Sequence, residues 1–315
     1  MTITAPFRGI LPAMQVPYND DLSVDIAELQ RFSNWLAGHE GIGGLVTNGH
    51  TGEVFALSAK ERALVTRTTV AAVDGKAPVV SGICAEGINE AVDHACMARD
   101  AGASGLLVMP PHYWLRFGME PEHVIEHFAA IGKAADINLV VHIYPAWSKA
   151  SYSSALLAEL AKLRWVTTFK VGTREMSKYD QDLRAIKNSG ENVSILTCHD
   201  EYLLTSMVQG VDGALVGFAS FIPELITALY AAVCDGNLKE AQRIQSRINV
   251  LKEVVYASSE PTGDAHARMK TAMHHAGRFK STTVRPPTRK PSGEALQRIK
   301  DAVEASGLIQ SQAAE

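Results

Sequence analysis

Two short runs of the chain, LVVHIY at Leu139–Tyr144 and WVTTFKV at Trp165–Val171, show the pattern that decides the predicted fold. Each is a short, largely apolar run, which is typical of a strand buried in a parallel sheet. Six more runs of this kind bring the predicted strands to eight: Ile10–Val16, Gly43–Asn48, Pro78–Gly82, Gly105–Met109, Val193–Cys198 and Gly213–Gly217.

Stretches with helical periodicity lie between these runs, among them Val24–Ala37, Ala59–Val73, Asn89–Ala101 and Pro121–Ala134. Eight strands, each followed by a helix, are the signature of a closed parallel (β/α)8 barrel, the α/β fold known as the TIM barrel. An open, doubly wound sheet shows the same alternation. However, no GxGxxG sequence follows the first strand, which disfavours a dinucleotide-binding fold.

The chain has 315 residues, and α/β barrels run to ~250 residues or more as one unit. We therefore expect the barrel at residues 1–235 and a C-terminal helical extension, packed on the barrel, at 236–315. The extension's predicted helices are Leu238–Ala257, Ala265–Gly277 and Gly293–Ala305. The proline-rich segment Thr282–Pro291 is short, so we interpret it as an ordered connection rather than a domain linker.

Composition limits the classes of function. The net charge is −4 without a basic stripe, so neither a nucleic acid nor a membrane is an expected partner. No apolar run approaches the ~18 residues that span a bilayer, and the N-terminus lacks the pattern of a signal peptide. The four cysteines lack CxxC spacing, which argues against a disulfide framework or a zinc site. These features predict a cytoplasmic protein.

Side chains alternate between the two faces of a strand, so the two quoted runs also predict what faces the barrel lumen. His142 and Tyr144 should point inward from one strand, and Thr168 and Lys170 from the next. Burial disfavours a charged lysine and lowers its pKa, and a neutral amine attacks carbonyl groups. The alternative is that Lys170 extends from the strand end into solvent, and the strand pattern alone leaves both interpretations open.

The loop after the second predicted strand reads GHTGE at Gly49–Glu53. Its two glycines let the backbone approach a ligand, and its backbone N–H groups with the Thr51 hydroxyl could hold a carboxylate. Most glycine-rich turns are only turns, and Tyr144 or His142 alone would more often be a hydrogen-bonded core residue. The sequence pattern by itself therefore gives a weak site prediction.

Together these segments resemble the dihydrodipicolinate synthase / N-acetylneuraminate lyase family from about Gly9 to Gly307. The family's G-x-x-G-E sequence appears as Gly49–Glu53, its fifth-strand tyrosine as Tyr144, and its sixth-strand lysine as Lys170 within FKVGT. The family's Pro-x-Tyr segment is similar to the sequence that ends at Tyr113.

The resemblance implies a lyase of the class I type, with no cofactor and no metal. Lys170 would condense with the 2-oxo group of a small-molecule acid, and Tyr144 would act as general acid and base. The substrate-binding groups would be the loop residues Gly49, His50 and Thr51 and the Leu215 carbonyl. In the family the residue matching Tyr113 reaches a neighbouring subunit, which implies a homotetramer built from dimers.

Three departures from the family pattern argue against dihydrodipicolinate synthesis. His50 stands where the synthase has the first threonine of a proton relay, and Val16 replaces a threonine before a proline. The arginine that recognises the second substrate is missing, with Lys149 nearby as a possible substitute. Lysine does not replace arginine in bidentate carboxylate binding.

Several segments, including GILPAMQVP at 9–17 and VRPP at 284–287, resemble a subgroup that acts on the pyrroline hydroxycarboxylate derived from hydroxyproline. We therefore expect dehydration or deamination of a C4-hydroxylated 2-oxo or cyclic imino acid, with His50, titrating near neutral pH, as a candidate proton donor. The alternative is retro-aldol cleavage of a longer 2-oxo acid to pyruvate and an aldehyde. A non-catalytic 2-oxo acid-binding regulator is disfavoured because both Lys170 and Tyr144 are retained.

Aromatic and histidine residues outside these motifs give two minor predictions. Trp114, Phe117 and Trp147 could form a wall for a bulky aldehyde, although packing is the favoured interpretation. His123 and His127 have i, i+4 spacing but lack the glutamate of a zinc-protease helix, so a solvated helix face explains them better.

Overall fold

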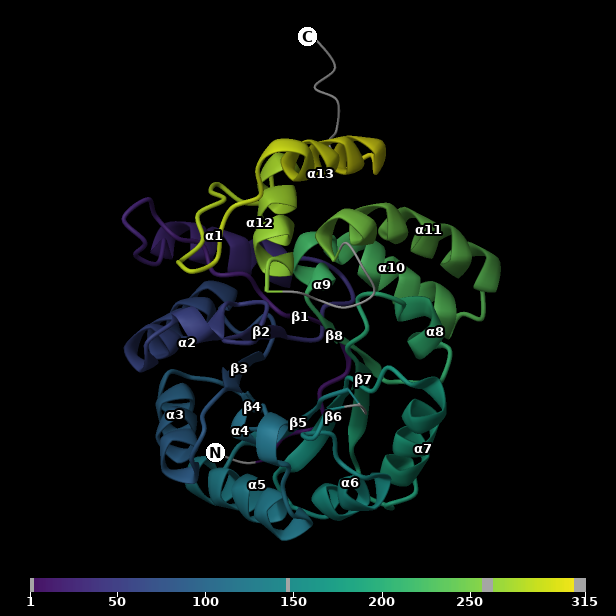
Figure 1. The fold of residues 1–315 in the computed structure, drawn as a ribbon. Coiled ribbons are helices and arrows are strands. Elements are labelled where there is room, and N and C mark those ends of the chain that lie inside the picture. Colours follow the sequence, from purple (N-terminus) through teal and green to yellow (C-terminus); the bar gives the residue numbers. More distant parts are fainter. Residues whose placement is uncertain (1–2, 146–147, 257–262, 309–315) are drawn as a thin grey trace.

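The computed structural model describes residues 3–145, 148–256 and 263–308, and in them eight parallel strands curl into a barrel surrounded by helices (Figure 1). The strands are β1 Gly9–Pro12, β2 Leu45–Thr47, β3 Val79–Ile83, β4 Gly105–Val108, β5 Asn138–Ile143, β6 Val166–Val171, β7 Ser194–Thr197 and β8 Gly213–Val216. Neighbours follow the order β1-β8-β7-β6-β5-β4-β3-β2. The predicted (β/α)8 barrel is confirmed.

The barrel closes between β1 and β2 through single bridges rather than a continuous ladder. Ile10 pairs with Ile42 and Ala13 pairs with Val46, both in parallel. The first strand is shorter than the predicted Ile10–Val16 and ends at Pro12. Beyond it the backbone still bonds both neighbours, because Ala13 N–H donates to the Val216 carbonyl and Met14 N–H to that of Val46.

The helices follow the strands around the ring (Figure 1). Their bounds are α1 Ile26–Ala37, η1 Val54–Ala56, α2 Ala59–Val73, α3 Ile88–Asp100, α4 Tyr113–Phe117, α5 Pro121–Ala135, α6 Ser154–Ala161, α7 Met176–Lys187, α8 Leu203–Met207, α9 Phe218–Phe221, α10 Pro223–Cys234, α11 Leu238–Val255, α12 Ala265–His275 and α13 Gly293–Ala305. The local sequence explains where several of these helices begin. Ser58 and Glu61 form a capping box at α2, and Pro121 begins α5 where its missing N–H costs nothing.

The barrel has two separate apolar layers, as the strand alternation predicts. The lumen cluster contains Phe7, Leu11, Ala13, Val46, Val80, Leu107, Val140, Leu196 and Leu215, whereas Leu139, Val141 and Ile143 belong to the larger core that includes the helices. Phe7 also anchors to the lumen wall, because its N–H donates to Thr168 Oγ1 at 3.1 Å and its carbonyl accepts from Ser194 Oγ at 2.6 Å. The lumen is therefore a packed core that supports a site at the strand ends.

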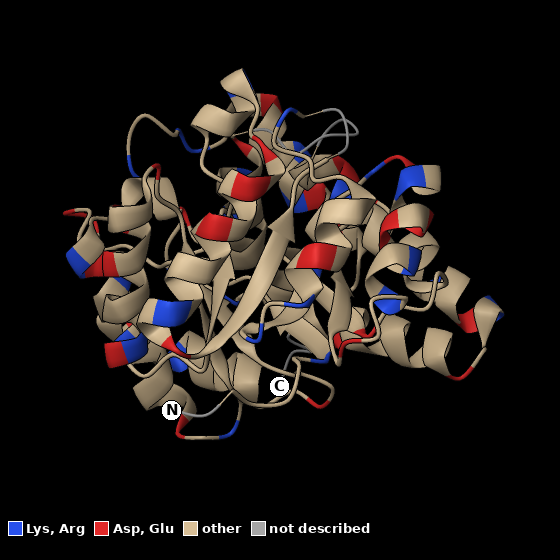
Figure 2. Cartoon of the chain, turned by 90° about the horizontal axis from the view of Figure 1, so that it is seen from below, with Lys and Arg blue, Asp and Glu red and all other residues tan. Residues whose placement is uncertain are grey.

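Figure 2 shows Lys, Arg, Asp and Glu mainly on the helices and loops around the barrel, with both signs interspersed. Among the helices of the described residues, none combines the length and the low polarity needed to cross a membrane.

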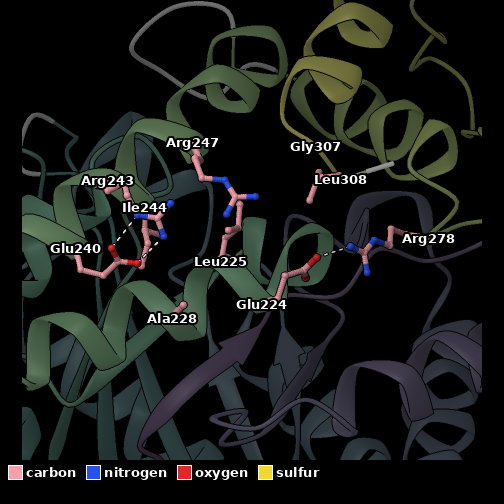
Figure 3. Close-up of a pocket in the computed structure, with 10 residues that line it drawn as sticks. All are labelled: Glu224, Leu225, Ala228, Glu240, Arg243, Ile244, Arg247, Arg278, Gly307 and Leu308. Carbon is pink, nitrogen blue, oxygen red and sulfur yellow. Dashed lines mark hydrogen bonds and ion pairs between the residues drawn. The ribbon is translucent and has the colours of Figure 1, made fainter. Parts of the chain in front are cut away.

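The C-terminal helices α11, α12 and α13 lie together on one side of the ring (Figure 1). A cavity of about 350 Å³ lies between α10, α11 and the segments that follow α12 and α13 (Figure 3). The division of the chain at residues 235 and 236 into barrel and extension stays a prediction.

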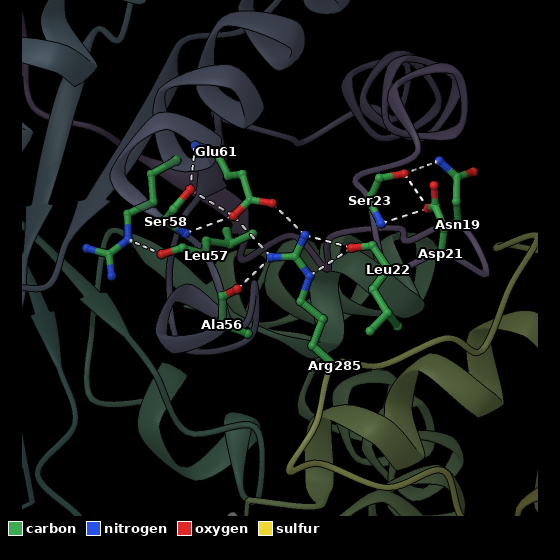
Figure 4. A network of polar contacts seen from close by, with 10 residues as sticks. Asn19, Asp21, Leu22, Ser23, Ala56, Leu57, Ser58, Glu61 and Arg285 are labelled. Atoms are coloured by element: carbon green, nitrogen blue, oxygen red, sulfur yellow. Dashed lines mark hydrogen bonds and ion pairs between the residues drawn. The ribbon is translucent and has the colours of Figure 1, made fainter.

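Arg285, in the proline-rich segment, ties the end of the chain to its beginning (Figure 4). Its guanidinium donates to the carbonyls of Leu22 and Ala56 and forms an ion pair with Glu61 at 2.5 Å. This ion pair, with hydrogen bonds from Ser58, lowers the pKa of Glu61 to about 2. The contacts hold η1 and the start of α2, which directly follow the glycine-rich loop.

Candidate active site

Lys170 lies next to last in β6 and opposite His142 of β5. Its side chain is half-buried. None of the hydrogen bonds and ion pairs recorded among the described residues involves its amine. Burial lowers the pKa of Lys170, while Cys198 and Asp200 oppose that shift and Arg174 adds to it. The amine is thus an unbonded nucleophile with an enlarged neutral fraction.

A second buried lysine provides a contrast. Lys270 of α12 is fully buried and donates to the Val16 carbonyl at 2.9 Å, the Thr283 carbonyl at 3.1 Å and the Glu53 carboxylate. Its nitrogen also lies 4.5 Å from the centre of the Tyr18 ring. All its donors are used, so Lys270 is a structural residue that anchors the glycine-rich loop through Glu53.

Tyr144 follows β5 and is 7% exposed. Its hydroxyl lies 3.3 Å from Nε2 of His50, the histidine of the glycine-rich loop. Burial raises the pKa of Tyr144 well above its usual value, with smaller contributions from Cys84 and Glu86. The phenol is therefore protonated at neutral pH, and the tautomer of His50 decides which of the two groups donates in this hydrogen bond.

His50 is neutral in the free protein. Burial lowers its pKa to about 3, and the positive charge of Lys170 adds to the shift, as do His266 and His112. The expectation that His50 titrates near neutral pH is therefore wrong, because a half-buried imidazole close to a lysine resists a positive charge of its own.

Aromatic rings pack closely around this pair. The His50 ring stacks on Phe55 with centroids 5.2 Å apart and lies 5.6 Å from His142. His142 is buried, and its Nδ1 has no hydrogen-bond partner among the described residues. Burial holds the pKa of His142 well below its usual value, and Lys170 and His50 make smaller contributions in the same direction. The strand alternation correctly placed His142 beside Lys170 but gave it no role.

The glycine-rich loop turns sharply and is anchored by its own backbone. Glu53 N–H donates to the His50 carbonyl at 2.9 Å, and Val54 N–H to that of Gly49 at 3.3 Å. No backbone bond among the described residues uses the N–H groups of His50 and Thr51. A Cβ on Gly52 would lie 2.9 Å from the Met14 carbonyl, whereas one on Gly49 would meet nothing within 4 Å. Gly52 is thus required by packing, while the space beside Gly49 is open.

Across from this loop lie β8 and the start of α9. A Cβ on Gly217 would lie 3.0 Å from Thr51 Oγ1, which shows that the loop approaches this backbone closely. Asp200 accepts hydrogen bonds from Gly217 N–H and Phe218 N–H and from the Tyr256 hydroxyl, and burial raises its pKa to about 6. Leu215 is fully buried in the lumen cluster.

His266 of α12 is a site neighbour that the sequence patterns did not reveal. Its pKa is lowered to about 4, mainly by burial and to a smaller extent by the positive charges of Lys270 and Lys170. Its Nδ1 is buried without a hydrogen-bond partner among the described residues. It lies four residues before Lys270, and this helical spacing places both histidine and lysine on the inner side of α12.

Two predicted substrate-binding residues lie apart from these contacts. Lys149 is exposed and donates to the Arg116 carbonyl at 3.0 Å. Tyr113 is 47% exposed, and its N–H donates to Glu86 at 3.0 Å. The structure records no contact of either with Lys170 or Tyr144 among the described residues, and their binding roles stay predictions.

The minor predictions about aromatic and histidine residues have different outcomes. Trp114 is 2% exposed and packs on His127, so it is a core residue, whereas Phe117 is 72% exposed. His127 is buried between Trp114 and Phe128, so a solvated face is the wrong explanation for it. Trp147 lies outside the described residues. Among those described, no group of three His, Cys, Asp or Glu side chains is suited to hold a metal ion.

Comparisons with known proteins agree with this geometry. Residues 6–306 match the model of the dihydrodipicolinate synthetase family. The chain is 28% identical over 308 residues to a 4-hydroxy-tetrahydrodipicolinate synthase of Gluconacetobacter diazotrophicus, covering 97% of this chain and 99% of that one. It is 24% identical to a probable 2-dehydro-3-deoxy-D-pentonate aldolase of Escherichia coli, with 96% and 98% covered. A prophage protein of the dihydrodipicolinic acid synthase family from E. coli, solved with pyruvate, has the same fold, with a TM-score of 0.87, 23% identity and 96% and 100% covered.

Proposed function

Because the chain belongs to the dihydrodipicolinate synthetase family of class I lyases and aldolases, we propose that Lys170 forms a Schiff base with a 2-oxo acid. The observation that carries the proposal is the contrast between the half-buried Lys170 and the fully buried Lys270. Lys270 has a carboxylate and two carbonyls as partners, whereas Lys170 has none recorded among the described residues. An unpaired amine at a strand end of the barrel is disfavoured unless it reacts or binds.

In the first step the neutral Lys170 amine attacks the 2-oxo carbon. Tyr144 donates a proton to the hydroxyl of the adduct, which leaves as water and gives a protonated imine and a Tyr144 phenolate. The backbone N–H groups of His50 and Thr51 are available for the substrate carboxylate. The positive imine nitrogen attracts electrons, so a proton at C3 becomes acidic. The Tyr144 phenolate takes that proton, which leaves an enamine and a protonated Tyr144.

We propose elimination as the second step. The enamine expels the C4 substituent, and a C4 hydroxyl leaves as water once it receives a proton. Tyr144 holds a proton at neutral pH and His50 does not gain a second one, so Tyr144 is the proton donor. The proposed substrate is the hydroxyproline-derived pyrroline hydroxycarboxylate. Here Lys170 displaces the ring nitrogen from C2, so the ring opens to a free amine on C5, and the C4 hydroxyl then leaves as water. The unsaturated C5 amine tautomerises to an imine, whose hydrolysis releases ammonia, and hydrolysis of the Lys170 imine releases 2-oxoglutarate semialdehyde.

Retro-aldol cleavage is the second candidate. It needs a base at the C4 hydroxyl, and the Tyr144 phenolate left by imine formation, whose oxygen lies 3.3 Å from His50 Nε2, is suited to take that proton. The aldolase name of the E. coli relative also favours this reaction.

The first experiment is borohydride reduction in the presence of pyruvate, followed by peptide mass mapping. A reduced adduct is expected on Lys170 and absent from Lys170→Met. Lys133→Met, which changes an exposed lysine of α5, is the matched control and should keep the adduct. Mapping of the adduct to another lysine contradicts the proposal.

The second experiment separates the two reactions. The purified protein is incubated with the pyrroline and, separately, with C4-hydroxylated 2-oxo acids, and the products are identified by mass. Elimination predicts a product that retains every carbon atom. Stoichiometric pyruvate with an aldehyde contradicts elimination and supports the aldolase.

A further inference from the structure

The cavity between α10, α11 and the two C-terminal segments combines apolar walls with charged groups (Figure 3). Its volume of about 350 Å³ falls in the ~300–1,000 Å³ range of small-molecule sites. Its lining comprises Leu225, Ala228, Ile244, Gly307 and Leu308 together with Glu224, Glu240, Arg243, Arg247 and Arg278. It lies outside the barrel mouth and contains none of the residues proposed for the reaction.

Two of the three arginines are already neutralised by carboxylates. Arg243 binds Glu240 through two bonds of 2.7 and 2.6 Å. Arg278 forms an ion pair with Glu224 and stacks its guanidinium 5.0 Å from the Trp35 ring centre. Neither arginine therefore needs an additional anion.

Arg247 has no carboxylate ion-pair partner within the described residues. Its recorded hydrogen bond is a long one of 3.5 Å to the Ser306 carbonyl. The charge of Arg247 contributes to the lowered pKa of Glu240, but Arg243 already binds both oxygens of that carboxylate. In Figure 3 the Arg247 guanidinium extends from α11 toward Leu225 and Leu308. A planar guanidinium beside an apolar wall suits a carboxylate attached to an aliphatic group.

The same cavity contains an unused acceptor. Glu224 binds Arg278 through Oε1, and its Oε2 is buried without a hydrogen-bond partner among the described residues. Leu225 lies between Glu224 and Arg247 in Figure 3. A buried carboxylate oxygen without a donor is costly, and an ammonium group would satisfy it.

We propose that this cavity binds a neutral α-amino acid with an aliphatic side chain. Its carboxylate pairs with Arg247, its ammonium donates to Glu224 Oε2, and its side chain packs on Leu225, Ile244 and Leu308. A zwitterion satisfies both unpaired groups at once, whereas phosphate or a simple carboxylate leaves the Glu224 oxygen unmet.

The test is calorimetric titration of the full chain with L-leucine and two analogues. One analogue, 4-methylpentanoate, lacks the ammonium group, and the other, 3-methylbutylamine, lacks the carboxylate. Saturable binding of leucine at millimolar concentration or below is expected, with both analogues at least about tenfold weaker because each loses one charge-assisted pair. Absence of saturable leucine binding overturns the proposal, and 4-methylpentanoate binding as tightly as leucine overturns the role of Glu224.

Variants locate the binding. Arg247→Gln should weaken leucine binding at least about tenfold, and Arg247→Lys should retain part of it. Arg184→Gln on α7, which removes an exposed arginine in a surface ion pair, is the matched control and should bind normally. Equal binding by Arg247→Gln and the parent chain overturns the assignment. Leucine has no ketone or aldehyde group and cannot form an imine with a lysine. Borohydride trapping at Lys170, run in parallel, therefore reports on the proposed reaction separately.

Discussion

Replacing each buried lysine by methionine should change the free energy of unfolding in different ways. Lys270→Met removes a cation that has three hydrogen-bond acceptors and leaves the Glu53 carboxylate, 9% exposed, without its counter-ion. Removing one partner of a buried pair costs about 3–5 kcal/mol. At roughly 2–4 °C per kcal/mol for a large domain, Tm should fall on the order of 10 °C.

Lys170→Met removes an amine with no recorded partner and relieves the cost of burying its charge. The expected change in unfolding free energy is therefore zero or a gain of up to about 2 kcal/mol. The difference between the two variants, about 3–7 kcal/mol, combines these two ranges and is easily resolved by urea denaturation.

A second substitution tests the cause of the loss at Lys270. Glu53→Gln in the Lys270→Met background should recover part of the lost stability, because the unpaired carboxylate is gone. Equal destabilisation by Lys170→Met and Lys270→Met would refute the distinction between a reactive and a structural lysine on which the proposed function depends.

Four further predictions concern the reaction, pH and assembly. Tyr144→Phe should slow turnover ~10²–10⁴-fold, as expected for a lost general acid, while borohydride still traps the imine; near-normal turnover removes Tyr144 from the mechanism. The pKa of Glu61 is lowered from 4.5 to about 2, so its ion pair with Arg285 stabilises the fold above pH 4.5, and this stabilisation is lost as pH falls toward 2. Arg285→Gln should therefore lower the free energy of unfolding by about 1–2 kcal/mol at pH 7, allowing for solvent screening, and by progressively less in denaturation experiments at lower pH. A cost that does not change with pH contradicts this account. Condensation of pyruvate with aspartate semialdehyde should be poor because His50 replaces a relay threonine, and an efficient synthase assay contradicts that. Light scattering should give a tetramer whose dimer contact involves Tyr113, and a monomeric mass at micromolar concentration excludes it.

The strand alternation predicted much of the site because period two is a local property of the backbone. It correctly separated Val140 in the lumen from Leu139 and Val141 in the outer layer. The same rule brought Lys170 and His142 to one face, where the structure pairs them across β5 and β6. These contacts depend only on register between neighbouring strands.

Contacts from distant segments could not be predicted in this way. The inner side of α12 has a local signal, since Lys270 occurs among buried residues such as Met269 and Met273. Its partner Glu53 is 217 positions away and no periodicity links the two. The pKa of His50 was misjudged for a related reason, because its shift depends on burial and on Lys170, which the loop sequence does not contain.

The Lys270 contacts also constrain how the protein is made on the ribosome. The glycine-rich loop is synthesised long before its anchor, because Glu53 pairs with a lysine 217 positions later and that lysine also donates to the Thr283 carbonyl. A nascent chain that already contains Lys170 and Tyr144 still lacks the anchor for the loop beside them. The rate at which residues 171 to 283 are synthesised therefore sets how long an incomplete barrel is exposed before its reactive end is complete.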